Sequence, residues 1–248
     1  MLDLSSTKLL YLEDFSLLES EATIQEILGE GGKPIVILDK TIFYPQGGGQ
    51  PYDTGTVESS SARFSVEEVR FVDGVVKHIG RFEHGFFSKG EAVKCSVDPE
   101  RRTLHSRIHS AGHIVDMAVA DLELPWTPGK GYHFPNGPYV EYEGSLEGWD
   151  KDKLRTDIEK GCNNMIGKGG EVKAVFVDKE RMRSICRFVP TNIPADKPTR
   201  VVLFGEFGIP CGGTHVRNLS EIRSMTIRKV KADDANIRVG YDVAREHA

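Results

Sequence analysis

The chain has 248 residues, of which 39% are hydrophobic and 28% are charged, and its formal net charge is −5. This composition is typical of a soluble, turn-rich protein with one large or two modest domains, and it excludes a disordered chain. The negative charge argues against nucleic-acid binding by bulk positive charge, although it leaves room for a local basic face.

No apolar run approaches the length of a membrane span, and the first 18 residues lack the basic start and unbroken apolar stretch of a signal peptide. We therefore expect a cytoplasmic protein with no membrane partner. The cysteines lack the dense spacing of a disulfide framework, so reduced thiols are expected. They are Cys95, Cys162, Cys186 and Cys211. A reduced cysteine can serve as a metal ligand.

Short apolar runs separated by glycine turns fill the first hundred residues. A run at 34–39 precedes the Gly-rich segment YPQGGGQPYDTG at 44–55. Farther on, the pair Asp73-Gly74 stands between two β-like runs, which is a hairpin pattern. We predict a small antiparallel β-barrel over residues 1–97 that carries the Gly-rich loop.

The pattern changes at Asp98-Pro99, where an N-cap aspartate followed by proline predicts the start of a helix. Apolar residues then recur at three- and four-residue spacing as far as Leu122, and a second amphipathic helix is expected at 150–166. Segments of strand character follow at 172–177, 200–204, 222–230 and 237–243. We therefore predict an α+β fold for residues 98–248.

Basic residues gather in two stretches of the second part. These are Arg101, Arg102 and Arg107, and then Arg223, Arg228, Lys229 and Lys231. Either group could meet phosphates if the fold brings its members together, or could be ordinary solvated charge.

Three histidines of the first predicted helix, His105, His109 and His113, are each four residues apart and project from nearly the same face. Two imidazoles at this spacing can bind one Zn²⁺, although buried, hydrogen-bonded histidines would give the same pattern. The spacing alone leaves both interpretations open.

A second pair at the same spacing, Cys211 and His215, lies in the segment CGGTH. Thiolate and neutral imidazole both suit Zn²⁺, and the intervening glycines allow the loop to curl around one ion. A tight turn with a buried thiol is the alternative. Because HSAGH has Ser110 where the HExxH motif has its glutamate, a zinc protease is excluded.

The segments YPQGGGQPYDTG, HSAGH and CGGTHVRNLSEI resemble, in this order, the markers of alanyl-tRNA editing proteins (AlaX) and of the editing region of alanyl-tRNA synthetase. The last two resemble the second additional domain of threonyl- and alanyl-tRNA synthetases. The resemblance implies a translation-factor-like barrel followed by a zinc-binding tRNA-editing domain. It also implies tRNA as the partner and Zn²⁺ as the cofactor, bound by His109, His113, Cys211 and His215, with His105 outside this set.

We assign Thr214, Gln50 and Glu141 as candidate catalytic residues and Gly47, Gly48, Gly49 and Lys130 as candidate substrate-binding residues. The Gly-rich loop has a structural alternative as a tight turn between strands. The chain departs from the family pattern at Gly129, where members often have glutamine, and at Glu141, where an aspartate is usual. These departures affect the shape of the amino-acid pocket.

The expected activity is hydrolysis, in trans, of mischarged Ser-tRNA(Ala), with Gly-tRNA(Ala) and Ser-tRNA(Thr) as further candidate substrates. The alternatives are a non-catalytic, zinc-containing tRNA-binding module and a metal-dependent hydrolase of a free small ester or amide. Four protein ligands leave no vacancy on a tetrahedral ion, so a catalytic and a structural role for zinc both stay open. The sequence makes no prediction about the oligomeric state.

Overall fold

The computed structural model describes residues 6–189, 198–233 and 236–244. It divides the chain into two compact units, Met1–Gly47 with Pro51–Thr103 and Gly48–Gln50 with Leu104–Ala248. The tip of the Gly-rich segment thus belongs to the second unit, although its flanks belong to the first. The division lies inside the helix that begins at Pro99, whereas the sequence predicts a boundary between residues 97 and 98.

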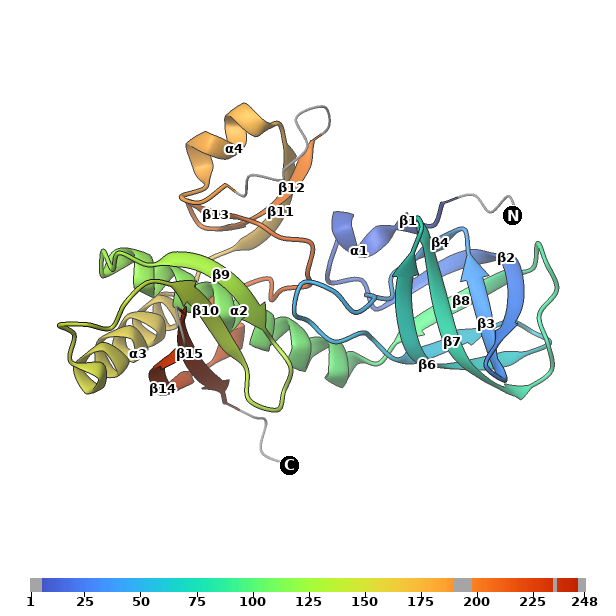
Figure 1. Cartoon of the computed structure of the whole chain (residues 1–248). Coiled ribbons are helices and arrows are strands. Elements are labelled where there is room, and N and C mark those ends of the chain that lie inside the picture. Colours follow the sequence, from blue (N-terminus) through green and yellow to red (C-terminus); the bar gives the residue numbers. More distant parts are fainter. Residues whose placement is uncertain (1–5, 190–197, 234–235, 245–248) are drawn as a thin grey trace. The chain divides into compact units, whose positions relative to one another are not determined.

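The first unit is a closed barrel of antiparallel strands in the order β2-β3-β7-β6-β5-β8 (Figure 1). Its strands are β2 (Glu19–Glu30), β3 (Lys33–Leu38), β5 (Gly55–Glu58), β6 (Arg63–Val72), β7 (Val75–His84) and β8 (Ala92–Val97). Short strands β1 (Lys8–Leu9) and β4 (Lys40–Thr41) pair in parallel, and helix α1 (Leu10–Glu13) follows β1. The predicted barrel is confirmed.

Local sequence sets the register of this barrel. Asp73 and Gly74 have φ angles of 50° and 82°, the left-handed pair required by the two-residue turn between β6 and β7. In β8, Val93, Cys95 and Val97 are buried and alternate with more accessible residues. Apolar side chains on one face of each strand therefore fill the interior.

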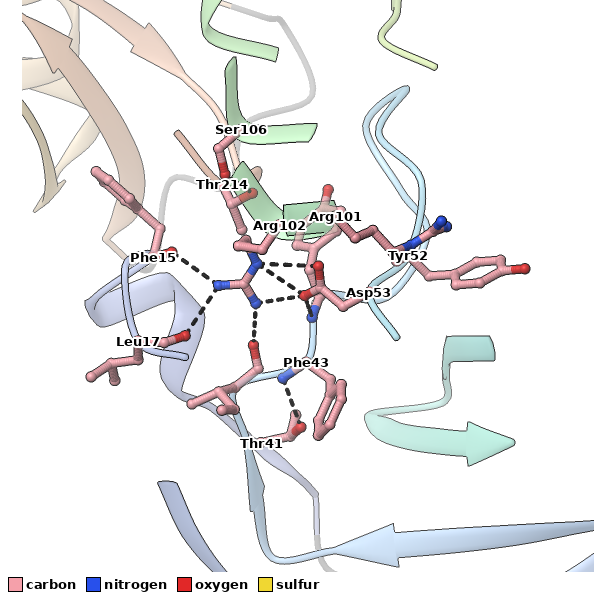
Figure 2. A network of polar contacts seen from close by, with 12 residues as sticks. Phe15, Leu17, Thr41, Phe43, Tyr52, Asp53, Arg101, Arg102, Ser106 and Thr214 are labelled. Carbon is pink, nitrogen blue, oxygen red and sulfur yellow. Dashed lines mark hydrogen bonds and ion pairs between the residues drawn. The ribbon is translucent and has the colours of Figure 1, made fainter. Parts of the chain in front are cut away.

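A buried ion pair anchors the start of helix α2 (Pro99–Asp121) within the first unit (Figure 2). The Arg102 guanidinium donates to the Asp53 carboxylate at 2.5 Å and also to the carbonyl oxygens of Phe15, Leu17 and Ile42. Because every arm of Arg102 is engaged and only 3% of the side chain is exposed, it is not available for phosphate.

Arg107 is also unavailable for phosphate binding. It is buried in the second unit, where its Nη2 atom donates to the carbonyl oxygens of Ile222 and Ala244. Arg228 likewise donates to the carbonyl oxygens of Tyr241 and Pro138. These contacts are structural, so the interpretation of the arginine clusters as phosphate sites is wrong for Arg102 and Arg107.

The second unit contains a sheet in the order β14-β15-β10-β9 and a smaller sheet in the order β11-β12-β13 (Figure 1). The strands are β9 (Thr127–Tyr132), β10 (Tyr139–Glu143), β11 (Val172–Val177), β12 (Thr199–Phe204), β13 (Phe207–Pro210), β14 (Met225–Asp233) and β15 (Asn236–Val243). Helices α3 (Lys151–Lys168) and α4 (Lys179–Ile185) complete it, and α3 packs against β14. The predicted α+β class is confirmed.

Helix α2 begins where the sequence predicts, because the Asp98 side chain accepts hydrogen bonds from the N–H groups of Glu100 and Arg101. Residues 105–115 are buried on all sides of the helix rather than along one stripe. The predicted stripe member Leu122 lies beyond the helix end and is 38% exposed. Polar residues of α2 must therefore find partners inside the protein.

The predicted strand at 222–230 is shifted in the structure. Residues Leu219–Ile222 form the 3₁₀ helix η1, and β14 starts only at Met225. Asn218 and Glu221 make a capping box that starts η1, so the strand begins only after this helix. Within the described residues, no helix combines the length and apolar character required to cross a membrane.

Candidate metal centre

Four side chains converge in the second unit: His109 and His113 from α2, and Cys211 and His215 from the loop after β13. Their potential ligand atoms all lie within 4.8 Å of one another. The Cys211 sulfur is 3.5 Å from Nε2 of His109 and 3.4 Å from Nε2 of His215. The fold therefore brings together the two pairs that the sequence keeps about a hundred residues apart.

Each histidine uses its Nδ1 atom for a contact outside the cluster. His109 Nδ1 donates to Gln50 Oε1 at 2.7 Å, and His113 Nδ1 is 3.3 Å from Asp116 Oδ2. His215 Nδ1 hydrogen-bonds Ser110 Oγ at 3.2 Å. This leaves the three Nε2 atoms facing the cysteine, an arrangement typical of metal-binding histidines.

Electrostatics also suit a cation. Burial, followed by the neighbouring basic groups, lowers the pKa values of His109 and His215 well below the usual range, so both are neutral donors. Burial alone would lower the pKa of His113, but Asp116 and Cys211 outweigh it and raise that pKa to about 9. The Nε2 atom of His113 is nevertheless buried without a hydrogen bond of acceptable geometry.

Burial alone would raise the pKa of the Cys211 thiol, but His113, the Gly213 N–H group and Arg200 lower it overall. These contacts stabilise negative charge on the Cys211 sulfur next to the three imidazoles. A divalent ion binds thiolate and neutral imidazole and displaces their protons. Three imidazoles and one thiolate are a donor set that Zn²⁺ accepts, so the residues present fit the metal implied by the sequence.

Close packing explains two glycines of the motifs. A Cβ atom on Gly213 would lie 2.1 Å from Cε1 of His109, and one on Gly112 would lie 2.5 Å from Cε1 of His133. Neither position tolerates a side chain without moving an imidazole. Arg200 fixes the loop of Cys211 and Gly213 by donating hydrogen bonds to the carbonyl oxygens of both residues.

A cavity of about 710 Å³ opens beside the cluster, within the usual range of small-molecule sites. His109, His113 and Cys211 line it. Asp116, Tyr142 and His133 contribute further polar groups, and Arg187 and Phe188 contribute a cation and an exposed aromatic ring. The cavity therefore combines candidate metal ligands with a mixed polar and apolar wall.

The candidate catalytic residues Gln50 and Thr214 lie behind the cluster and do not line the cavity. Both are fully buried, and Gln50 Nε2 donates to Thr214 Oγ1 at 2.8 Å. Gln50 Oε1 also accepts the Thr214 N–H group at 3.0 Å, and Thr214 Oγ1 contacts Ser106 Oγ. Their geometry suits positioning of His109 and its loop rather than contact with a substrate.

The structure sets Glu141 apart from the cluster. Its carboxylate accepts from Arg238 Nε at 2.9 Å, while its neighbours Val140 and Tyr142 line the cavity. Because successive side chains of a strand point to opposite faces, Glu141 points away from the cavity wall. Its expected catalytic role therefore has no support from this geometry.

Three of the candidate substrate-binding residues, Gly48, Gly49 and Lys130, line the cavity. Gly47 does not line it, and its carbonyl oxygen instead accepts from the Tyr44 hydroxyl in the first unit. Gly49 has a φ of 76° and its carbonyl oxygen accepts the His133 N–H group at 2.8 Å. The Gly-rich loop thus contributes backbone to the cavity wall.

Sequence reasoning missed His133 and Asp116. His133 stacks on His109 with ring centroids 4.3 Å apart, and its Nδ1 contacts the Tyr241 hydroxyl at 2.8 Å. No spacing rule connects it to the ligands, so no sequence signal was available. Asp116 follows His113 by three residues on α2, a spacing that could have identified it. His105 is buried outside the four-residue cluster.

Comparison with known proteins agrees with this architecture. Residues 7–101 match the family described as tRNA synthetases class II (A), and residues 199–238 match the threonyl and alanyl tRNA synthetase second additional domain. The alanyl-tRNA editing protein AlaX-M of Methanosarcina barkeri is 31% identical over 91% of this chain and 93% of its own length. The chain belongs to the alanyl-tRNA editing protein family.

Other relatives differ in length. The editing protein AlaX-L of Pyrococcus horikoshii is 28% identical over 92% of this chain, which spans 55% of that protein. The alanine–tRNA ligase of Halobacterium salinarum is 32% identical over 91% of this chain, which spans only 24% of the ligase. The chain thus matches nearly the whole of a short editing protein and about a quarter of a ligase.

Proposed function

We propose that this chain hydrolyses the ester bond of mischarged aminoacyl-tRNA in trans, with Ser-tRNA(Ala) as its main substrate. The observation that carries the proposal is the convergence of His109, His113, Cys211 and His215 beside a cavity of about 710 Å³. Membership of a family whose similar members are named alanyl-tRNA editing proteins supports the choice of tRNA.

We propose Zn²⁺ as the ion held by these four residues. Zinc, when bound, supplies a Lewis acid that polarises an ester carbonyl or a water molecule. The protein residues supply position: Gln50 holds the His109 ring, Ser110 holds His215, and Arg200 holds the loop of Cys211. We assign Gln50 and Thr214 as positioning residues and leave Glu141 out of the catalytic group.

The size of the cavity favours a substrate larger than a free amino acid. Its wall includes the basic side chains of Lys130 and Arg187 and the 43% exposed ring of Phe188. Cations attract phosphates, and aromatic rings stack on unpaired bases. These residues are suited to the unpaired 3′ end of a tRNA, with Gly48 and Gly49 as further contacts on the wall.

Selection of serine over alanine requires recognition of one hydroxyl group. A wall with polar atoms, such as those of Tyr142 and His133, can hydrogen-bond that hydroxyl, and an alanyl group would leave those atoms unpaired. Glycine also lacks the hydroxyl, but its smaller size leaves room for a water molecule that can pair with those polar atoms, and rejection by size alone contributes only about 1–3 kcal/mol. We therefore expect measurable hydrolysis of Gly-tRNA(Ala) as well.

The test compares release rates from Ser-tRNA(Ala), Gly-tRNA(Ala), Ala-tRNA(Ala) and Ser-tRNA(Thr), using full-length protein loaded with one zinc ion. We expect fastest release from Ser-tRNA(Ala) and release from Ala-tRNA(Ala) near the uncatalysed rate. Bound zinc and bound tRNA without accelerated release from any substrate would refute the hydrolase and favour a non-catalytic tRNA-binding module. Faster release from Ser-tRNA(Thr) would assign the chain to another tRNA.

A further inference from the structure

The proposed substrate carries a positive charge next to the bond that is broken. The aminoacyl group of a charged tRNA has an α-ammonium on the carbon attached to the ester carbonyl. Taking such a cation into a cavity removes part of its hydration, which is costly unless an anion or hydrogen-bond acceptors replace the water. A cavity built for aminoacyl esters therefore needs an acidic group or other hydrogen-bond acceptors near the reacting carbonyl.

Asp116 is the single acidic residue among the described residues that line the cavity. It lies on α2 three residues after His113, so the two side chains share one face of the helix, and its side chain is 16% exposed. The carboxylate thus stands directly beside the candidate metal centre while still reaching the cavity. We propose that Asp116 binds the α-ammonium group of the aminoacyl substrate, an inference that rests on the proposed function.

The carboxylate is held in place and keeps capacity for another donor. Its Oδ1 atom accepts from the Tyr142 hydroxyl at 2.7 Å, and its Oδ2 atom is 3.3 Å from His113 Nδ1. A carboxylate offers about four acceptor positions, so these two contacts leave room for an ammonium. Within the described part of the chain, Asp116 forms no ion pair with a lysine or arginine.

The cavity wall also carries two basic side chains. Arg187 donates to the carbonyl oxygen of Ala120, one helical turn beyond Asp116, and Lys130 lies on β9. The cavity therefore has one anionic position next to the ligand histidines and two cationic positions elsewhere on its wall. This polarity matches a substrate with an ammonium at the reacting end and phosphates at the other end.

The alternative is that Asp116 only orients the His113 ring and does not contact the substrate. Two ligands distinguish these roles. One is the seryl amide of 3′-amino-3′-deoxyadenosine, which cannot be hydrolysed as an ester, and the other is its analogue with hydrogen in place of the α-amino group. Calorimetry gives the dissociation constant of both for the full chain, for Asp116→Asn, for Asp116→Glu and for the control Glu141→Gln. Zinc content is measured for every protein.

We expect the wild type, Glu141→Gln and Asp116→Glu to bind the amine-bearing ligand about tenfold or more tightly than its analogue, as one charged hydrogen bond implies. Asp116→Asn should bind both ligands alike and keep the wild-type affinity for the analogue. If this variant loses zinc, Asp116→Ser, which keeps an acceptor for His113 without the charge, is measured in its place.

Two results would overturn the inference. One is equal weakening of both ligands by Asp116→Asn, which a supporting role would produce. The other is a preference for the amine-bearing ligand that is the same in Asp116→Asn as in the wild type, including no preference in either protein. If the zinc-loaded wild type binds neither ligand, the proposed function itself fails, and this outcome is distinct from a loss of discrimination.

Discussion

The imidazole of His109 is fixed by a single amide oxygen, and this contact makes Gln50 a sensitive position. Gln50 Oε1 accepts from His109 Nδ1 at 2.7 Å and from the Thr214 N–H group at 3.0 Å. Replacement by alanine would leave both donors buried and unpaired. The ring would then lose the orientation that points its Nε2 atom at the cluster.

We therefore predict that Gln50→Ala lowers zinc affinity by about 10- to 100-fold, the effect typical of a lost contact behind a ligand. Competition with a chelating indicator measures the change. Glu141→Gln is the matched control, because Glu141 contacts Arg238 outside the cavity, and its zinc affinity should equal that of the wild type. Unchanged affinity in Gln50→Ala would contradict the positioning role.

Phe188 and Phe176 form a natural comparison on the surface. Both rings are exposed, at 43% and 52%, but only Phe188 lines the cavity. Stacking of one base on an aromatic ring contributes about 1–3 kcal/mol. Phe188→Ala should therefore raise the KM for Ser-tRNA(Ala) by about 5- to 150-fold, while Phe176→Ala leaves it unchanged. Equal effects in both variants would remove Phe188 from the substrate site.

Spacing rules identified each of the two pairs as possible ligands, because residues four apart on a helix lie on one side, but only the family resemblance joined the two pairs into one site. The spacing rules could not find His133, because its contact with His109 forms only in the folded chain and depends on the absence of a side chain at Gly112. The sequence also could not give the direction of the Glu141 side chain. Family likeness placed Glu141 in the site, but the alternation of side chains along β10 points it away from the cavity.

At the scale of elements, the barrel contains a buried histidine whose charge is suppressed. His78 on β7 contacts the Val36 carbonyl oxygen at 3.0 Å and Thr41 Oγ1 at 2.8 Å. Burial lowers its pKa to about 4, against an ordinary value near 6.5. Between these values the unfolded chain binds more protons than the folded chain.

The stability contributed by neutral His78 is thus fully present above about pH 6.5 and is lost as the pH falls toward 4. We predict a decrease of about 2 kcal/mol in the free energy of unfolding of the barrel between pH 7 and pH 5 from this residue. An NMR titration of the His78 ring checks the cause. A midpoint near 6.5 in the folded protein would contradict it.

Element boundaries were predictable where local chemistry is strong. Asp98-Pro99 fixes the start of α2, and Asp73-Gly74 fixes the hairpin of β6 and β7. The shift of the predicted strand at 222–230 also has a local cause that the strand pattern hides, since the capping box of Asn218 and Glu221 starts η1, which takes Ile222, and Arg223 follows with a φ of 69°. The all-round burial of α2 also escaped prediction, because its polar residues are satisfied only in the folded protein.

At the scale of the whole molecule, the barrel and the α+β unit each have their own core, but the candidate site belongs to the second unit. Gly48–Gln50 are part of that unit, so the Gly-rich segment contributes one positioning side chain and two backbone contacts to it. The resemblance in sequence indicated that this segment and the His/Cys motifs belong to one function. The structure adds which of its residues reach the cavity.

The most direct test of the account is the rate of serine release from Ser-tRNA(Ala) by the wild type and by Cys211→Ala at equal protein concentration, with zinc content measured in both. We predict rapid release by the zinc-loaded wild type, and loss of both zinc and hydrolysis in Cys211→Ala. Glu141→Gln, whose carboxylate contacts Arg238 outside the cavity, is the control and should keep both. Wild-type release rates from Cys211→Ala protein without zinc would contradict the proposed site.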